Sequence, residues 1–485
     1  MNQSGPVSVA PLHVRRLVLM GYAALGAFAV WYWTATKWPD DELNLLAIGM
    51  LILGVWPTLR WLGRHDATYP LIETLLLTTI PFYALPLITE HEAIVDYPIV
   101  ALRQAAGVIL TFQLACIAGS MLAAKSYTSR PHGDWWRMEL VPEHKLKFTA
   151  HTMTLMTVWL LVSTFTDWIP QDWLGTFRAI FYGLGILSTF IQARVWGGGD
   201  STLREKVLFC CNLGCQLILT FSTLLLIYGI SSILIALVGF FSSARRVPWL
   251  PCVILLPVLA VLHNGKSRMR EIYWQEGAPA VGITDLPPYF TQWFQFGLQA
   301  ASQEDSARHS TALTFGLMRR ASLYQIVCVT TNIIPDRAPF LDGESYRLIP
   351  AQILPRFVWP NKPSPNDSMK VLAIHLGILT REEAEYTSIG FGMVAESYAN
   401  FGYVSVAGLG ILLGFGLRRL AVSTVACATL SLPGIFRILC MAWCLSAETT
   451  LAVWLSSLYQ ACVAILVPLF LWKYLTSGGP GADGS

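Results

Sequence analysis

The sequence predicts an all-α, polytopic helical membrane protein. Only 13% of its 485 residues are charged and 54% are hydrophobic, whereas an ordinary soluble domain carries about 25% charged residues. The mean hydropathy of +0.51 is positive. Many apolar stretches approach the ~20 residues that a helix needs to cross the hydrocarbon core, so we expect about 11–12 transmembrane helices with one large external loop.

The predicted spans follow the apolar stretches in chain order. The charge-free run 207–243 is too long for one crossing, so we divide it near Gly229 into two helices. A weaker span is predicted between about 420 and 447, where Pro433 and Arg437 interrupt the hydropathy. The other predicted spans cover 17–35, 43–62, 69–89, 98–124, 149–166, 174–193, 248–262, 401–417 and 450–472.

These spans predict four regions. Residues 1–262 form N-terminal transmembrane helices, and 263–388 form a large external loop that carries the motifs described below. Residues 389–473 form C-terminal transmembrane helices, and 474–485 form a flexible cytoplasmic tail. The first apolar segment is a retained helix rather than a cleaved signal peptide, because aromatic residues stand where small cleavage-site residues belong.

Loop charges predict the orientation in the membrane. Arg15 and Arg16 precede the first span, an acidic loop at 40–42 follows it, and Arg60 and Arg64 follow the second span. This alternation continues along the chain. Since cytoplasmic loops are enriched in Lys and Arg, we expect both termini to be cytoplasmic.

The ten cysteines predict no disulfide framework and no zinc site. They are scattered through apolar segments, and Cys210, Cys211 and Cys215 share one predicted span without a paired C-x-x-C motif.

The external segment contains many basic residues. The positive-inside rule does not explain them, because it concerns cytoplasmic loops. Guanidinium groups bind phosphate oxygens through paired hydrogen bonds, so these residues fit a pyrophosphate at the membrane interface. Headgroup binding or salt bridges within the loop are the alternatives. The residues are Lys266, Arg268, Arg270, Arg319, Arg320, Arg337, Arg347, Arg356 and Lys362.

Lys266 and Arg270 share one face if their segment is helical. The Gly265-Lys266-Ser267 triplet between the preceding span and Arg270 is not a P-loop, because the first glycine of that motif is missing.

A proline-rich string follows 341–347. Four prolines between 355 and 365 exclude a helix and give a rigid backbone. It would present Arg356, Trp359 and Lys362 as two cations and an aromatic face for a phosphosugar. A structural brace is the alternative.

A third string, 392–402, leads into a predicted span. Glu396 and Asn400 are four residues apart and so share a helical face. A carboxylate at the edge of a span is costly unless it faces protein or a wet cavity. Glu396 is therefore a candidate general base, and a local cap or pairing role is the alternative.

Together these strings resemble the oligosaccharide repeat-unit (Wzy-type, O-antigen) polymerases, over roughly 340–410. One departure is Ser405, where we would expect another glycine. The matching residues are Gly343, Tyr346, Pro355, Arg356, Trp359, Pro360, Lys362, Pro363, Glu396, Tyr398, Asn400 and Gly402.

The resemblance implies a bacterial inner-membrane glycosyltransferase that polymerises undecaprenyl-diphosphate-linked repeat units at the periplasmic face, for O-antigen, capsule or exopolysaccharide. It places the 263–388 loop in the periplasm. It also implies a reaction that needs no metal and no other cofactor, and no nucleic acid partner. The expected partners are membrane lipid, a chain-length regulator and a flippase.

The departing diphosphate needs cations, and the attacking sugar hydroxyl needs a base. We assign catalysis to Arg356, Arg347 and Glu396. The predicted substrate-binding residues are Lys266, Arg270, Tyr346, Trp359, Lys362, Tyr398 and Asn400.

Four other functions remain open from the sequence. The acidic loop 40–42 would suit a metal-dependent lipid-phosphosugar transferase. A transporter or flippase of lipid-linked glycans would line its path with the arginines. A glycan ligase would use the same donor for a different acceptor, and a scaffolding protein would need no site.

Overall fold

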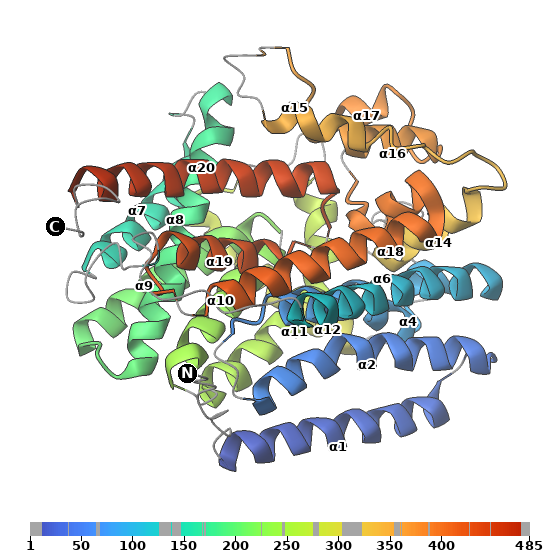
Figure 1. Ribbon diagram of the computed structural model, residues 1–485, viewed down its shortest axis with the longest axis horizontal. Coiled ribbons are helices and arrows are strands. Elements are labelled where there is room, and N and C mark those ends of the chain that lie inside the picture. The colour runs from blue at the N-terminus through green and yellow to red at the C-terminus, as the bar shows by residue number, and fades with distance from the viewer. Residues whose placement is uncertain are drawn as a thin grey trace. The chain divides into compact units, whose positions relative to one another are not determined.

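The computed structural model contains helices and, among the residues it describes, no strand (Figure 1). The predicted all-α polytopic membrane protein is confirmed, because seven described helices are long and apolar enough to cross a membrane. The described residues are 12–36, 38–64, 68–125, 137, 147–166, 168, 171–224, 226–244, 248–274, 281–302, 323–353, 359, 361–386, 389–425, 427–446 and 448–476.

These seven candidate spans match seven predicted stretches. They are Val14–Ala35 in α1 (Leu12–Ala35), Asp41–Gly63 in α2 (Asp41–Arg64), Leu71–Ile88 across α3 (Leu71–Thr79), η1 (Ile80–Ala84) and α4 (Leu85–Ile88), Ile99–Ala123 in α6 (Ile99–Lys125), Trp249–Lys266 in α11, Gly392–Ser423, which is the whole of α18, and Leu451–Leu471 in α20 (Leu451–Thr476).

Four further helices cover other predicted spans and are 19 to 28 residues long. They are α7 (Lys147–Phe165), α8 (Gln171–Gly198), α9 (Leu203–Ser222) and α10 (Leu226–Ala244). The predicted span at 420–447 holds a shorter helix, α19 (Leu432–Trp443), of 12 residues. A helix of that length extends about 18 Å, which is less than the bilayer core.

The division of the run 207–243 comes earlier than predicted. Helix α9 ends at Ser222, and Leu224 in the connection adopts a left-handed φ of 59°. Gly229 lies inside α10, where a Cβ atom would come within 2.2 Å of the Phe221 ring. Gly229 is therefore a close-packing position, not a turn.

The segment predicted to be external contains mostly short helices. Helix α11 (Trp249–Tyr273) continues beyond its span, and α12 (Leu286–Ser302) follows it. The remaining described elements are η4 (Ile283–Asp285), α14 (Leu323–Ile333), η5 (Tyr346–Leu348), α15 (Ile349–Ile353), α16 (Asp367–His375) and α17 (Glu383–Tyr386).

The chain forms two compact units, and each is discontinuous in sequence. The first unit contains Met1–Glu139 and Arg319–Tyr459, and the second contains Leu140–Met318 and Gln460–Ser485. The motif strings between 341 and 402 therefore belong to the first unit, together with α2 and α6. Lys266 and Arg270 belong to the second.

Helices α2, α6 and α18 run in the same direction through the first unit. Arg103, near the start of α6, bonds Asp40, which precedes α2. Further along, Gln113 donates to the Met50 carbonyl (3.1 Å). Tyr403 of α18 donates to the Gln104 carbonyl (3.4 Å), so all three helices begin at the same end.

Glycines let the backbones of α6 and α18 meet, and the two helices lie side by side (Figure 1). A Cβ atom on Gly414 would lie 2.0 Å from the Cys116 carbonyl oxygen, and one on Gly119 would lie 2.3 Å from the Ile411 oxygen. Small residues at this spacing are how membrane helices approach closely in lipid.

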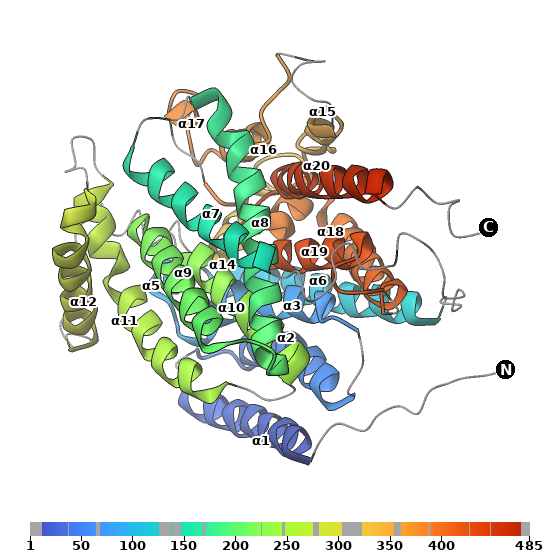
Figure 2. The same cartoon turned by 90° about the vertical axis from the view of Figure 1, so that its left-hand side faces the viewer.

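In the second unit, α7, α8, α9 and α10 form a helix bundle (Figure 2). Polar side chains join α7 to α9: Thr157 donates to Asn212 (2.9 Å), and Gln216 donates to Thr157 (3.1 Å). Glycines bring α11 and α12 together, since a Cβ atom on Gly265 would lie 2.6 Å from the Trp293 oxygen. The Gly-Lys-Ser triplet is thus part of a continuous packed helix.

Candidate active site

The site in the first unit begins at a kink in α18. Phe401 and Gly402 have non-helical backbone angles, with φ of 64° at Gly402. The kink separates segment 392–400, whose residues are all buried, from the longer helix that follows. At a kink the preceding carbonyls lose their intrahelical donors, so segment 392–400 needs hydrogen-bond donors from elsewhere.

The turn at 340–346 supplies these donors. The Leu341 N–H donates to the Ala399 carbonyl (2.9 Å), and the Asp342 N–H donates to the Asn400 carbonyl (3.2 Å). Two of the predicted motif strings, 341–347 and 392–402, therefore fold into one hydrogen-bonded structure.

Two glycines allow this contact. Gly343 has φ of 86°, and a Cβ atom there would lie 3.2 Å from the Phe401 ring. A Cβ atom on Gly402 would lie 3.3 Å from the Phe340 ring. Gly343 thus leaves room for the Phe401 ring, and Gly402 leaves room for the Phe340 ring. Both glycines have a positive φ, which glycine tolerates best.

Glu396 and Asn400 meet through Ser345. Glu396 is 0% exposed, and its Oε2 accepts from the Leu451 N–H at the start of α20 (2.6 Å). The Ser345 hydroxyl interacts with this carboxyl group and accepts from Asn400 Nδ2 (2.8 Å). Oε1 of Glu396 forms no hydrogen bond within the described part of the chain. The site therefore contains a buried carboxyl oxygen with spare acceptor capacity.

Tyr346 and Arg347 connect this buried centre to the surface. Tyr346 is half-buried, and burial raises the pKa of its hydroxyl, with the Glu396 charge adding to the increase and a hydrogen bond with Ser397 opposing it. Arg347 is exposed, and among the described residues no ion pair involves it. Tyr398 is buried and meets Phe340 edge-on, with ring centroids 6.3 Å apart.

The proline-rich string is only partly described, and Arg356, Pro355 and Pro360 lie outside the described residues. Trp359 is 43% exposed, as expected for a presented aromatic face. Lys362 is buried instead, and its Nζ donates to the Gln352 carbonyl (3.4 Å). Gln352 also donates to the Pro363 carbonyl (3.1 Å). Lys362 thus braces the end of α15, which favours the structural alternative for this lysine.

Lys266 and Arg270 lie on α11 in the second unit, where the helix places them on one face as predicted. Lys266 is half-buried. Arg270 Nη2 donates to the Leu224 carbonyl (2.8 Å), and its guanidinium lies 4.1 Å from the Trp274 ring centroid. Part of its bonding capacity therefore stabilises the end of α9.

No protein-family model, curated protein or solved structure matches this chain. The resemblance over 340–410 therefore rests on the motif residues alone. Ser345, which joins two of the motif strings, was not predicted as a site residue. Its position beside Tyr346 in the first string was the available signal.

The acidic loop 40–42, which a metal-dependent transferase would use to bind its metal ion, forms ion pairs with Arg103. Arg103 Nε donates to Asp40 (2.9 Å), and its Nη1 pairs with Glu42 (2.7 Å). Asp40 also accepts from the Leu43 N–H at the start of α2 (2.9 Å). Two of the loop's three carboxylates are thus committed to Arg103, and a metal ion would have to compete with it.

We expect Asp40 to make the stability of the folded protein decrease at acidic pH. Hydrogen bonds from Arg103 and then from the Leu43 N–H lower the pKa of Asp40. Its contribution is present above the unfolded pKa of about 4 and is lost as pH falls through the lower folded value. As the pH is lowered from about 6 to about 2, the unfolding midpoint of Asp40→Asn should decrease less steeply than that of wild type. The exposed neighbour Asp41→Asn is the control, and an identical slope in Asp40→Asn would refute this role.

Proposed function

We propose that this protein is a glycosyltransferase that polymerises undecaprenyl-diphosphate-linked oligosaccharide repeat units at the periplasmic face of a bacterial inner membrane. The observation that carries the proposal is the joining of strings 341–347 and 392–402 around Glu396. These strings are far apart in the sequence, and both belong to the resemblance.

The chemistry assigns a task to each part of this centre. A hydroxyl oxygen of the acceptor sugar attacks the anomeric carbon of the donor, and the bond from that carbon to the lipid diphosphate breaks through an oxocarbenium-like state. Arg347 binds the departing diphosphate from its exposed position. Glu396 takes the hydroxyl proton on Oε1, with Ser345 and Tyr346 as its polar neighbours.

The position of this centre along the helices supports a periplasmic site. It lies at the end of the first unit where α6 begins, because Tyr403, directly after the kink, bonds the Gln104 carbonyl. Arg60 and Arg418 lie toward the other ends of α2 and α18. Positive-inside reasoning places those arginines in the cytoplasm.

The test is polymerisation by purified protein reconstituted with lipid-linked repeat units. Wild type should give a ladder of products on a gel. Arg347→Gln should reduce product by about 100-fold or more, since one lost charge-stabilising donor costs roughly that much in other enzymes. Arg381→Gln, another exposed arginine of the first unit, should leave the ladder unchanged.

Other outcomes separate the remaining candidates. A wild-type ladder from Arg347→Gln would remove Arg347 from the mechanism. Transfer of a finished glycan to a single acceptor would identify a ligase. Movement of the lipid-linked glycan across the membrane without new glycosidic bonds would identify a flippase and overturn the proposal.

A further inference from the structure

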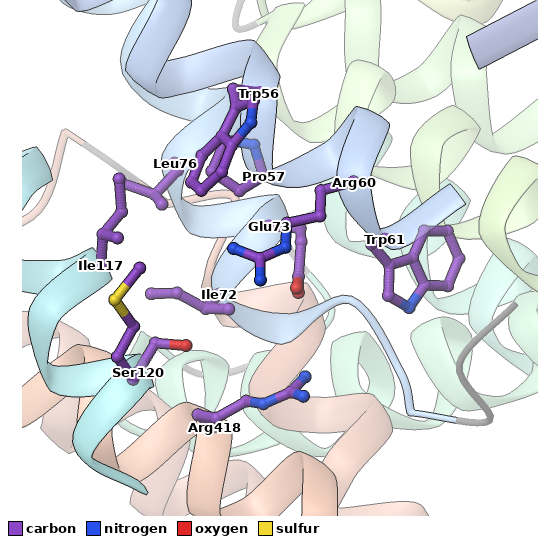
Figure 3. A pocket seen from close by; sticks show the side chains of 11 residues that line it. Trp56, Pro57, Arg60, Trp61, Ile72, Glu73, Leu76, Ile117, Ser120 and Arg418 are labelled. Atoms are coloured by element: carbon purple, nitrogen blue, oxygen red, sulfur yellow. The ribbon is translucent and has the colours of Figure 1, made fainter. Parts of the chain in front are cut away.

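A second polar feature of the first unit is a pocket between α2, α3 (Leu71–Thr79), α6 and α18. It encloses about 120 Å³, well above the roughly 10–15 Å³ that one water needs. Arg60 and Arg418 reach into it from opposite sides, and Glu73 stands between them (Figure 3). Its apolar lining includes Leu76 and Ile117.

Neighbouring groups orient both cations. The Arg60 guanidinium lies 5.1 Å from the Trp56 ring centroid, in the geometry of a cation–π contact. Arg418 Nη1 lies 3.5 Å from Thr68 Oγ1. The nearby Trp61 indole N–H donates to the Thr68 carbonyl (2.8 Å), which ties the segment before α3 to the end of α2.

The charge and the lining select an anion attached to an apolar group. Two guanidinium groups and one carboxylate leave one positive charge in excess. Arginine binds phosphate oxygens through its planar fork, and a single negative charge is that of a phosphodiester. The apolar residues on α3 and α6 belong to membrane-spanning segments, so they can receive the hydrocarbon part of an amphiphile.

This pocket is separate from the candidate active site. Tyr403 and Arg418 lie on the same helix after the kink, 15 positions apart, which corresponds to about 22 Å along its axis. The pocket is at the end that the loop charges assign to the cytoplasm. Basic pockets between spans on that side bind anionic headgroups in other membrane proteins.

We propose that Arg60 and Arg418 bind the phosphate of an anionic phospholipid from the leaflet opposite the active site. The lipid phosphodiester accepts hydrogen bonds from both guanidinium groups alongside the Glu73 carboxylate, and the proximal acyl carbons contact Leu76 and Ile117. Such a lipid would fix the ends of α2, α3, α6 and α18 relative to one another.

The test is native mass spectrometry of the full chain in detergent with added phosphatidylglycerol or phosphatidylcholine of equal chain length. Wild type should bind phosphatidylglycerol about tenfold more tightly than phosphatidylcholine, and Arg60→Gln/Arg418→Gln should lose this preference. Arg418→Lys, which keeps the charge but not the fork, should show an intermediate preference. Arg419→Gln makes the same charge change on the same helix outside the pocket lining and should bind like wild type.

Circular dichroism and the unfolding midpoint establish that each variant is folded before binding is compared. Equal preference for phosphatidylglycerol in the double variant and wild type would overturn the proposal. Equal binding of the two lipids by wild type would also overturn it. Displacement of phosphatidylglycerol by an equal concentration of inorganic phosphate would show that the pocket takes a free anion instead of a lipid.

Discussion

Gly414→Ala is expected to destabilise the first unit by about 3 kcal/mol or more, toward the upper end of the cost of overpacking. The added methyl carbon would lie 2.0 Å from the Cys116 carbonyl oxygen. That oxygen belongs to the backbone of α6, so no side-chain rotation relieves the clash and the helices must separate. The measurement is the unfolding midpoint in detergent, followed by circular dichroism.

Gly416→Ala is the matched control. The same methyl group on the same helix would meet nothing within 4 Å. Replacing a helical glycine by alanine favours the helix by roughly 0.5–1 kcal/mol, so the midpoint should stay the same or rise. A Gly414→Ala midpoint equal to that of Gly416→Ala would show that α6 and α18 do not pack through this contact.

Glu396→Gln is expected to lower polymerisation by about 100-fold or more while leaving the fold intact. General-base catalysis contributes roughly that factor or more. The glutamine carbonyl can still accept from the Leu451 N–H, as Glu396 Oε2 does. The product ladder measures activity, and the unfolding midpoint shows whether the hydrogen bond from the Leu451 N–H to residue 396 is retained.

Glu396→Ala separates chemistry from structure. It removes the acceptor of a part-buried N–H, and an unsatisfied group of that kind costs about 1–3 kcal/mol. Its midpoint should therefore fall below that of Glu396→Gln. Wild-type activity in Glu396→Gln, together with a lower midpoint in Glu396→Ala, would make Glu396 a structural anchor without a catalytic task.

Hydropathy was enough to predict most of the helices, but it carried no information about which helices pair. Gly119, Gly410 and Gly414 face a neighbouring backbone, whereas Gly408 and Gly416 on the same helix as two of them meet nothing within 4 Å. In the sequence these glycines are equivalent. Gly229 was interpreted as a turn for the same reason, although the Phe221 ring occupies the space beside it.

The site was predictable where it depends on helical spacing. Glu396 and Asn400 were expected on one face, and both converge on Ser345. Ser345 itself depends on the docking of the 340–346 turn against the kink, which links residues more than fifty positions apart. Lys362 was expected to present its charge, but its ammonium group is buried and donates to the Gln352 carbonyl.

The discontinuous first unit has a consequence for biosynthesis. Helix α18 begins about 270 residues after α6 ends, and at about 5–20 residues per second that interval lasts roughly 15–55 s. The nascent α6 therefore enters the bilayer before the helix that packs against its Gly119 face has been translated. Its principal neighbour is translated long afterwards, so lateral sorting of helices already in the membrane must precede the docking of α18.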